Sequence, residues 1–318
     1  MPIENMNSTS TYSVGLSPVL VALRTCFIAI IALLIISGNI LSIAVTRRVT
    51  NLADSTKVLM TSLAVFDLLL GFLALPSTAA SALDGWPFDV VGCDLVNLLI
   101  TMCFPMSMFS IVSLNIERFI AVTRPYKFTV WCTRFRVIMA VLFQAIISVC
   151  FSFLIVVASN IPAKFDDILQ LCDFDEAPFA IHIWILVSAD IFPTISMSYI
   201  YYRLIKISRQ HEQRLNQNGN NEANNNHDNK ALKTFLVVTL TFAGCYTPHL
   251  TLRTLTSLGV STPGSLSFLF LWLVISNSMF NVIIYCLFNK VFRQTAKKIL
   301  LERFPCCNRS VAPIEIEL

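Results

Sequence analysis

Seven long apolar stretches, separated by short polar segments, dominate the hydrophobic pattern of the chain. A helix needs about 20 apolar residues to cross roughly 30 Å of hydrocarbon, and each stretch reaches that length. Strand-like alternation at the spacing of a membrane barrel does not recur, so helices are the expected spanning structure. The pattern therefore predicts an all-α, seven-transmembrane helix bundle. The spans lie near residues 23–46, 57–80, 93–121, 136–158, 181–205, 231–256 and 266–288.

The composition supports a membrane protein. The 318 residues are 55% hydrophobic and only 13% charged, whereas a soluble domain carries about 25% charged residues. A soluble fold of this size could not keep so much apolar surface away from water. These values argue against a soluble enzyme, and the formal net charge of +4 is too small to indicate a nucleic-acid partner.

The distribution of lysine and arginine predicts the orientation. With the N-terminus outside, only Arg24, Lys164 and Arg253 of the 23 basic residues fall on the outer side. Basic residues collect on the cytoplasmic side of membrane proteins, so we expect a multi-pass plasma-membrane protein with its C-terminus inside. The expected divisions are an extracellular tail at 1–22, the bundle at 23–288, an amphipathic cytoplasmic helix at 289–304 and a C-terminal tail at 305–318. The asparagine-rich stretch 216–229 is expected to be a flexible linker.

Three sites outside the spans or at the end of one predict covalent modification. Asn7 begins an Asn-Ser-Thr glycosylation acceptor on the outer side, and its alternative is an unused acceptor. Cys93 and Cys172 both lie on the outer, oxidising face and are the natural disulfide pair. Cys306 and Cys307 follow the last basic segment, where palmitoylation or two reduced thiols are the alternatives.

Polar side chains within the spans are costly and therefore mark candidate functional sites. Asp67 is the clearest ionisable group of this kind. Its carboxylate, with nearby hydroxyl and amide oxygens, could hold a hard cation or could simply pack the helices together, and the residues alone favour neither. The other members at comparable depth are Asn39, Ser107, Asn277 and Asn281.

Arg118 is expected at the inner end of the third span. It follows Cys93 by a length of helix that crosses one bilayer with its interfaces. The neighbouring Glu117 can pair with it, and Asp228 is a second candidate partner. The alternative is an ordinary arginine that extends its charge to the membrane surface.

Along nearly its whole length, about 23 to 307, the chain resembles a rhodopsin-like (class A) G-protein-coupled receptor. The motifs occur in order, each at its expected depth. They are Gly38-Asn39, Leu63-Ala64-Val65-Phe66-Asp67, Trp86-Pro87-Phe88, Glu117-Arg118-Phe119, Pro193, Tyr201, Phe242, Cys245-Tyr246-Thr247-Pro248, Asn277-Ser278 and Asn281-Val282-Ile283-Ile284-Tyr285. The family's span-six Trp, span-seven Pro and span-four Trp are replaced here by Tyr246, Val282 and Ala145.

This resemblance implies the roles of the inner motifs. Arg118 would be held inside the bundle at rest and released to a heterotrimeric G protein, and Tyr201 and Tyr285 would move toward it. Asp67, Ser107, Asn277 and Asn281 would form an allosteric sodium site, with no other cofactor expected. The implied coupling and activation residues are Glu117, Arg118, Phe119, Tyr201, Phe242, Tyr246, Pro248, Asn281 and Tyr285.

The resemblance also places a ligand pocket between spans three, five, six and seven. Amine receptors of the family carry an Asp where this chain has Ile100, and opsins carry a Lys where it has Ile275, so both subclasses are disfavoured. Arg253 favours an anionic, lipid-like or peptide ligand, and its alternative is an arginine that reaches the interface. The expected lining is Ile100, Thr101, Phe104, Phe174, Ile185, Ala189, Tyr246, His249, Arg253 and Leu271.

The expected function is therefore a cell-surface receptor that converts ligand binding outside into G-protein activation inside. Two alternatives stay open. Asp67 and Asp190 could form the ion path of a small transporter or channel, although no inverted repeat is visible. The substitutions at Tyr246 and Val282 could instead indicate a receptor-like protein that does not signal.

Overall fold

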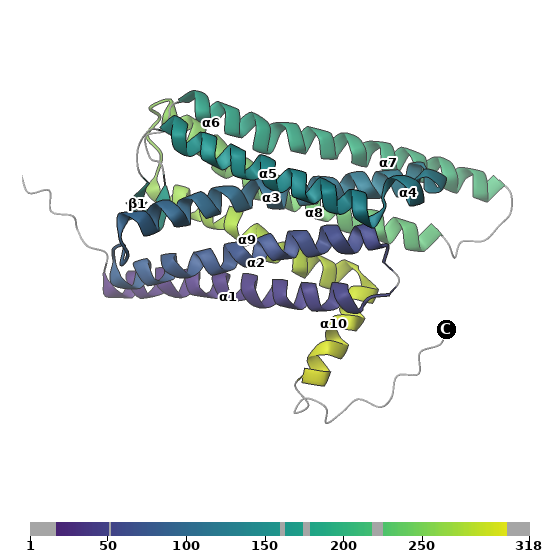
Figure 1. The fold of residues 1–318 in the computed structure, drawn as a ribbon, viewed down its shortest axis with the longest axis horizontal. Coiled ribbons are helices and arrows are strands. Elements are labelled where there is room, and N and C mark those ends of the chain that lie inside the picture. Colours follow the sequence, from purple (N-terminus) through teal and green to yellow (C-terminus); the bar gives the residue numbers. More distant parts are fainter. Residues whose placement is uncertain (1–16, 51, 160–162, 174–178, 218–224, 304–318) are drawn as a thin grey trace, which may run out of the picture.

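The computed structural model describes residues 17–50, 52–159, 163–173, 179–217 and 225–303, and it folds into a bundle of long helices (Figure 1). Asn7, Phe174, Cys306 and Cys307 lie outside the described residues. The elements in chain order are α1 (Pro18–Arg48), α2 (Asp54–Leu83), α3 (Val90–Thr123), α4 (Pro125–Trp131), α5 (Arg134–Ser159), β1 (Lys164–Asp166), β2 (Leu171–Asp173), α6 (Phe179–Leu186), η1 (Val187–Ile191), α7 (Phe192–Gln217), α8 (Asn225–Ser257), α9 (Gly264–Phe288) and α10 (Lys290–Arg303).

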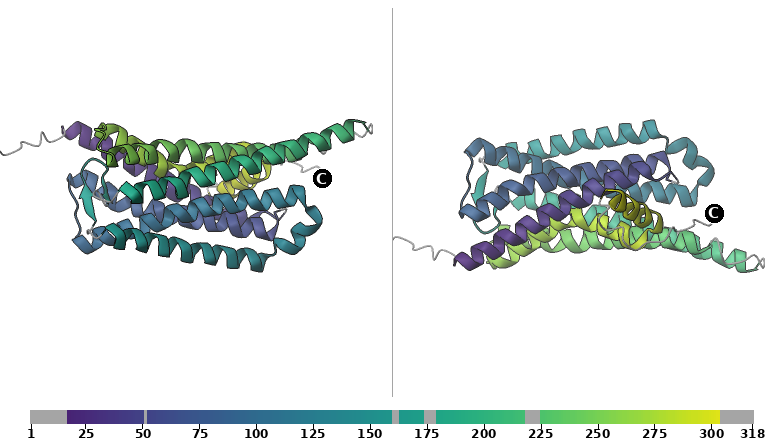
Figure 2. Two further views of the ribbon diagram at one scale, coloured as in Figure 1. Left: turned by 90° about the horizontal axis from the view of Figure 1, so that it is seen from above. Right: turned by 90° about the horizontal axis from the view of Figure 1, so that it is seen from below.

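The predicted all-α seven-helix architecture is confirmed. Within the described residues, five helices are long and apolar enough to cross a membrane, namely α1, α2, α3, α5 and α9. The continuous run α6–η1–α7 and the long helix α8 complete the bundle. The short helix α10 turns away from the bundle beyond the end of α9 (Figure 1), and Figure 2 shows α7 extending past the other helices.

The fifth span contains a π-helical turn, which the sequence analysis did not predict. Pro193 lacks a backbone N–H and therefore cannot donate to the carbonyl of Ala189. The turn η1 comes immediately before this proline, and the Phe192 N–H donates to the carbonyl of Val187 instead. Such π turns are frequently found at functional sites.

The expected linker at 216–229 is shorter in the structure. Helix α7 continues to Gln217, and α8 begins at Asn225. The prediction of a linker over 225–229 is therefore wrong, because asparagine weakens a helix only modestly and the apolar segment that follows extends it.

A short hairpin covers one end of the bundle. Strands β1 and β2 pair antiparallel, with Phe165 opposite Cys172. Asp166 closes the turn between them, because its Oδ1 accepts hydrogen bonds from the backbone N–H groups of Ile168 and Leu169 at 2.7 and 2.8 Å. We call this end of the molecule the hairpin end, and the opposite end the α10 end.

The α10 end is fixed by contacts from the first and last long helices. Arg48 at the end of α1 pairs with Glu302 of α10, and this hydrogen bond lowers the pKa of the Glu302 carboxyl. Arg293 donates to the carbonyl of Leu287 at 2.9 Å, which satisfies one of the last carbonyls of α9. Phe292 and Ala296 are the buried residues of α10, so its apolar side faces the bundle.

Close packing between α1 and α2 depends on Gly71. A Cβ atom at this position would lie 2.8 Å from Cγ2 of Ile35 and 2.9 Å from Cγ1 of Ile36. Gly38 in α1 is different, because a Cβ there would meet Val282 at an ordinary 3.5 Å.

We expect Gly71→Ala to destabilise the bundle by about 1–3 kcal/mol, because the added methyl group overpacks the α1–α2 contact. Gly38→Ala is the matched control and should cost little, since it fits the available space. The apparent melting temperature of each purified variant in detergent checks this. Equal melting temperatures for the two variants would contradict the assignment of Gly71 as a close-packing position.

Candidate functional site

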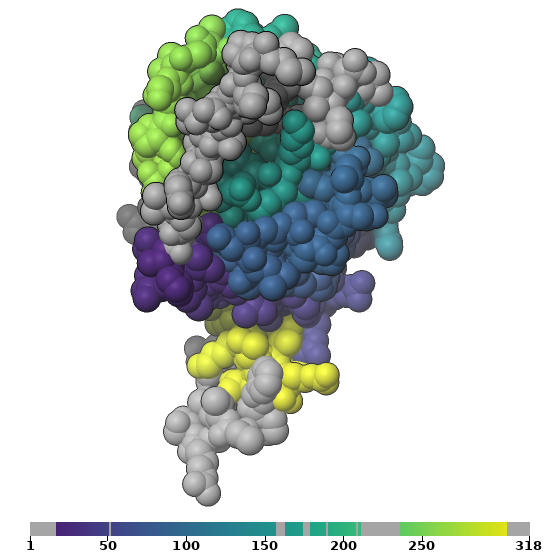
Figure 3. All heavy atoms as spheres, turned by 90° about the vertical axis from the view of Figure 1, so that its left-hand side faces the viewer, coloured from purple at the N-terminus to yellow at the C-terminus, as the bar shows by residue number. Residues whose placement is uncertain are grey.

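A cavity of about 170 Å³ opens near the hairpin end, between α3, α6, α8, α9 and strand β2. Figure 3 views this end and shows the surface hollowed between the segments around the cavity. Most of the lining is apolar. The lining residues are Asn97, Ile100, Thr101, Phe104, Pro105, Met108, Phe151, Ile155, Leu171, Cys172, Asp173, Ile181, His182, Ile185, Tyr246, His249, Leu250, Arg253, Thr254, Leu271 and Val274.

Eight of the residues expected in the ligand pocket line this cavity. They are Ile100, Thr101, Phe104, Ile185, Tyr246, His249, Arg253 and Leu271. The side chain of Ala189, within η1, is not among those described, and neither is Phe174. Asn97, Asp173 and His182 also line the cavity and were not predicted from the sequence. The helical period could have found Asn97, which lies one turn before Thr101 on the same face of α3.

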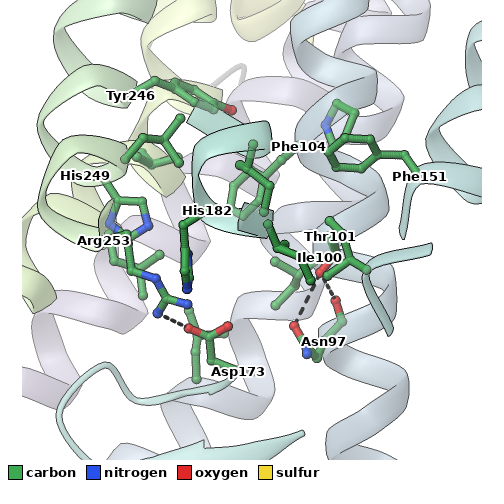
Figure 4. A pocket seen from close by; sticks show the side chains of 18 of the residues that line it. Asn97, Ile100, Thr101, Phe104, Phe151, Asp173, His182, Tyr246, His249 and Arg253 are labelled. Carbon is green, nitrogen blue, oxygen red and sulfur yellow. Dashed lines mark hydrogen bonds and ion pairs between the residues drawn. The ribbon is translucent and has the colours of Figure 1, made fainter. Parts of the chain in front are cut away.

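The mouth of the cavity carries an ion pair between the hairpin and α8. Arg253 of α8 donates to Oδ2 of Asp173 in β2 (Figure 4), and both side chains are about a quarter exposed. Arg253 was expected to favour an anionic ligand. In the structure its charge faces a carboxylate of the same chain, so the cavity carries these two charges as a neutral pair.

The hairpin is held over the cavity by three further contacts. The predicted disulfide between Cys93 and Cys172 is confirmed, with 5.5 Å between the Cα atoms. Trp272 of α9 donates from Nε1 to the carbonyl of Leu169 at 3.1 Å. Asp94 of α3 accepts from the Ala163 N–H at 2.7 Å. The hairpin is thus attached to α3, α8 and α9.

Aromatic side chains line the part of the cavity deepest in the bundle. Tyr246 stands edge-on to Phe104, with 6.3 Å between ring centroids, and stacks on Phe242 at 4.3 Å. Phe242 is fully buried. The ring of Tyr246 therefore connects the cavity to the buried side of α8, two residues before Pro248.

A polar cluster around Asp67 lies at the centre of the bundle. The carboxylate is fully buried. Its Oδ1 accepts from the hydroxyls of Ser107 and Ser278, each at 2.8 Å, and its Oδ2 accepts from Nδ2 of Asn281 at 3.0 Å. These groups come from α2, α3 and α9, so one side chain joins three helices.

The membership of this cluster differs by one residue from the expected set. Asn277 is buried, but no hydrogen bond joins it to Asp67 among the described contacts; the neighbouring Ser278 takes that place. Asn39 of α1 contributes indirectly, since its Nδ2 donates to the backbone carbonyl of Ser278 at 3.1 Å. The carboxylate, hydroxyl and amide side chains of this cluster carry oxygen atoms, the ligand type that a hard cation prefers.

A second buried carboxylate links the π turn to α8. Asp190 in η1 accepts from the hydroxyl of Thr247 at 3.0 Å and from that of Thr194 at 3.4 Å. Asp190 is 3% exposed. These two hydroxyls stabilise the carboxylate, which explains why a membrane-embedded Asp is tolerated here.

At the α10 end, the third helix brings Glu117 and Arg118 against α2. Ser55 and Thr56 donate to Oε1 of Glu117 at 3.0 and 2.7 Å. Arg118 lies 3.5 Å from the other carboxylate oxygen of Glu117 and donates to the Thr56 hydroxyl at 3.4 Å. Thr56 therefore contacts both members of the pair.

The other residues that were expected to take part in coupling and activation differ in how deeply they are buried. Tyr285 is buried, and its hydroxyl has no hydrogen-bond partner among the described residues. Phe119 and Tyr201 are half-buried. The side chain of Asp228, the second candidate partner of Arg118, lies outside those described.

Comparisons with known proteins point to one receptor family. The family model described as 7 transmembrane receptor (rhodopsin family) matches residues 38–285. The chain is 28% identical to the histamine H2 receptor of Cavia porcellus, over 94% of this chain and 81% of the relative. It is 26% identical to dopamine receptor 1 of Drosophila melanogaster, over 94% of this chain and 66% of the relative. It is also 26% identical to G-protein coupled receptor 52 of Mus musculus, over 87% of this chain and 80% of the relative.

We expect Ser107→Ala to destabilise the protein more than Ser110→Ala, although both serines are buried in α3. Ser107 donates at 2.8 Å to the Asp67 carboxylate, and a hydrogen bond to a charged group contributes about 1.5–3 kcal/mol. Among the contacts of the described residues, Ser110 meets only the Ser62 hydroxyl, at 3.5 Å. Melting temperatures of the two purified variants test this, and a larger loss for Ser110→Ala would refute the ranking.

Proposed function

Because the chain belongs to the rhodopsin family of seven-transmembrane receptors, we propose that it is a cell-surface receptor that converts binding of an extracellular ligand into activation of a heterotrimeric G protein. One observation carries this proposal. Helix α3 lines the cavity with Phe104, reaches the central cluster with Ser107 and carries Arg118 in its last turns. A shift of this helix would therefore change contacts both at the cavity and around Arg118.

We place the hairpin end outside the cell and the α10 end in the cytoplasm. The uneven distribution of lysine and arginine supports this orientation. A disulfide at the hairpin end also suits an oxidising compartment. The cavity then opens toward extracellular ligands, and Glu117 and Arg118 face the G protein.

Signalling in this proposal is a shift between two populations of the receptor. A ligand favours the active arrangement only if it binds that arrangement more tightly than the resting one. Contact with Tyr246 offers such a difference, because the ring stacks on Phe242 in α8. At the inner end, the active arrangement requires Arg118 to leave the Glu117 carboxylate and the Thr56 hydroxyl.

Ligand-free nucleotide exchange on a panel of purified G proteins tests the proposal. We expect Thr56→Val to raise basal exchange several-fold, because it removes a hydroxyl that contacts both Glu117 and Arg118. Arg118→Ala should abolish the exchange. Arg124→Ala removes an exposed charge from the same end of α3 and should leave the rate unchanged.

The possible outcomes separate the competing functions. Exchange that survives Arg118→Ala would refute the assigned coupling residue. A receptor and a Thr56→Val variant that are both silent on every G protein would favour a non-signalling receptor-like protein. Ion flux through reconstituted vesicles, lost in Asp67→Asn, would favour the transporter or channel.

A sodium ion beside Asp67 is a second part of the proposal. The carboxylate, hydroxyl and amide oxygens of Asp67, Ser107, Ser278 and Asn281 would hold it, and its charge would favour the resting arrangement. We expect sodium chloride to raise the melting temperature of the purified receptor relative to the same concentration of choline chloride. Asp67→Asn should abolish this difference, and a difference that persists in the variant would place the ion elsewhere.

A further inference from the structure

We propose that the cavity at the hairpin end takes a small uncharged molecule, with a single ring and a hydrogen-bonding group toward each side, in preference to an ammonium or a carboxylate. This inference rests on the proposed function, since it assumes that the cavity is the ligand site. It is carried by the volume of the cavity, by two buried polar atoms in its wall and by the pairing of its charges.

The volume limits the ligand to about one ring. The cavity has a volume of about 170 Å³, and an apolar protein cavity of roughly 150 Å³ binds benzene. Drug-sized ligands occupy pockets of about 300–1,000 Å³. A folded peptide or a complete lipid would therefore not fit inside without a large rearrangement, whereas a substituted ring would.

Two buried nitrogen atoms in the wall lack hydrogen-bond partners within the described part of the chain. Asn97 of α3 is 4% exposed and its Nδ2 is unpaired, while its Oδ1 accepts from the Thr101 hydroxyl at 3.3 Å. Nδ1 of His249 in α8 is likewise buried and unpaired. Figure 4 shows the two residues on different sides of the same cavity.

These atoms define what the ligand must present. An amide nitrogen is a donor, so Asn97 requires an acceptor such as a hydroxyl or carbonyl oxygen. Neutral histidine can offer Nδ1 as donor or acceptor, and a ligand hydroxyl can pair with either. Buried polar groups in folded proteins are nearly always paired, so a ligand that satisfies both atoms gains affinity that a purely apolar ligand cannot.

The charges in the wall favour a neutral ligand. Among the described residues, Asp173 and Arg253 are the charged residues that line the cavity, and they pair with each other across its mouth. An ammonium would find Ile100 beside it on α3 rather than a carboxylate, and a carboxylate ligand would have to displace Asp173. Burying a charge without an opposite charge is costly, whereas a neutral hydroxyl pays a much smaller penalty.

The body of the ligand would lie against apolar and aromatic side chains. Phe104 and Met108 project from α3, Leu271 from α9 and Tyr246 from α8. A ring in this space adds aromatic contacts to the burial of apolar area. It would also touch Tyr246, the residue through which the proposed receptor responds.

Three probes with the same hydroxyphenyl ring test the inference. Tyrosol carries a neutral alcohol, tyramine an ammonium and para-hydroxyphenylacetate a carboxylate. We expect calorimetric titration of the purified full-length receptor to give a dissociation constant for tyrosol about tenfold lower than for either charged probe. Equal or tighter binding of a charged probe, or no binding of tyrosol at millimolar concentration, would overturn the proposal.

Two substitutions that preserve shape serve as reciprocal controls. Asn97→Asp replaces the donor amide by a carboxylate, so the receptor should bind tyrosol more weakly and tyramine more tightly. Asp173→Asn removes the carboxylate that faces Arg253, so this variant should bind para-hydroxyphenylacetate more tightly. Because each variant is expected to improve one probe, misfolding cannot produce the pattern. Unchanged selectivity in both variants would refute the assigned contacts.

The titration contains no G protein, so its failure is distinguishable from failure of the proposed function. Selective binding of tyrosol without nucleotide exchange would leave this inference standing and remove the signalling role. Nucleotide exchange that depends on Arg118, together with tighter binding of a charged probe, would support the signalling role and overturn this inference.

Discussion

The hydrogen bonds that converge on the buried Asp67 carboxylate determine how half of the bundle is arranged. Within hydrocarbon, an unpaired carboxylate costs several kcal/mol, so α2 must keep the donors of α3 and α9 within reach. Asn39 adds α1 through the carbonyl of Ser278. The tight contact at Gly71 is compatible with this arrangement, because Gly71 lies one helical turn after Asp67 in α2 and packs closely against α1.

The other half of the bundle is joined by different means. Asp190 links the π turn to α8 through Thr247, and the aromatic stack of Phe242 and Tyr246 lies within α8 itself. Both α8 and the fifth span contain a proline, which removes a backbone hydrogen bond from each. Under the proposed function, a ligand in the cavity would act on this half of the bundle, and the Asp67 cluster would provide the fixed frame against which α8 could move.

Much of this architecture could be predicted from the sequence, for reasons that differ between elements. The spans follow from apolar length, and the Cys93–Cys172 bridge follows from topology. The Asp173–Arg253 pair could not be predicted, because the two residues lie 80 positions apart and Asp173 belongs to a short hairpin that the hydrophobic pattern does not indicate. The exchange of Asn277 for Ser278 has another cause: one residue along a helix rotates a side chain by about 100°, so spacing alone could not decide between neighbours.

The attachments of the hairpin also bear on how long a ligand remains bound. The covalent bridge to α3 keeps β2 over the cavity, whereas the link to α8 is an ionic contact between Asp173 and Arg253 that is partly open to solvent. Departure of a ligand past this contact would require it to open, and differences in affinity between related complexes arise mostly from dissociation rates. The ion pair would then set residence time, and higher ionic strength would shorten it by screening the attraction.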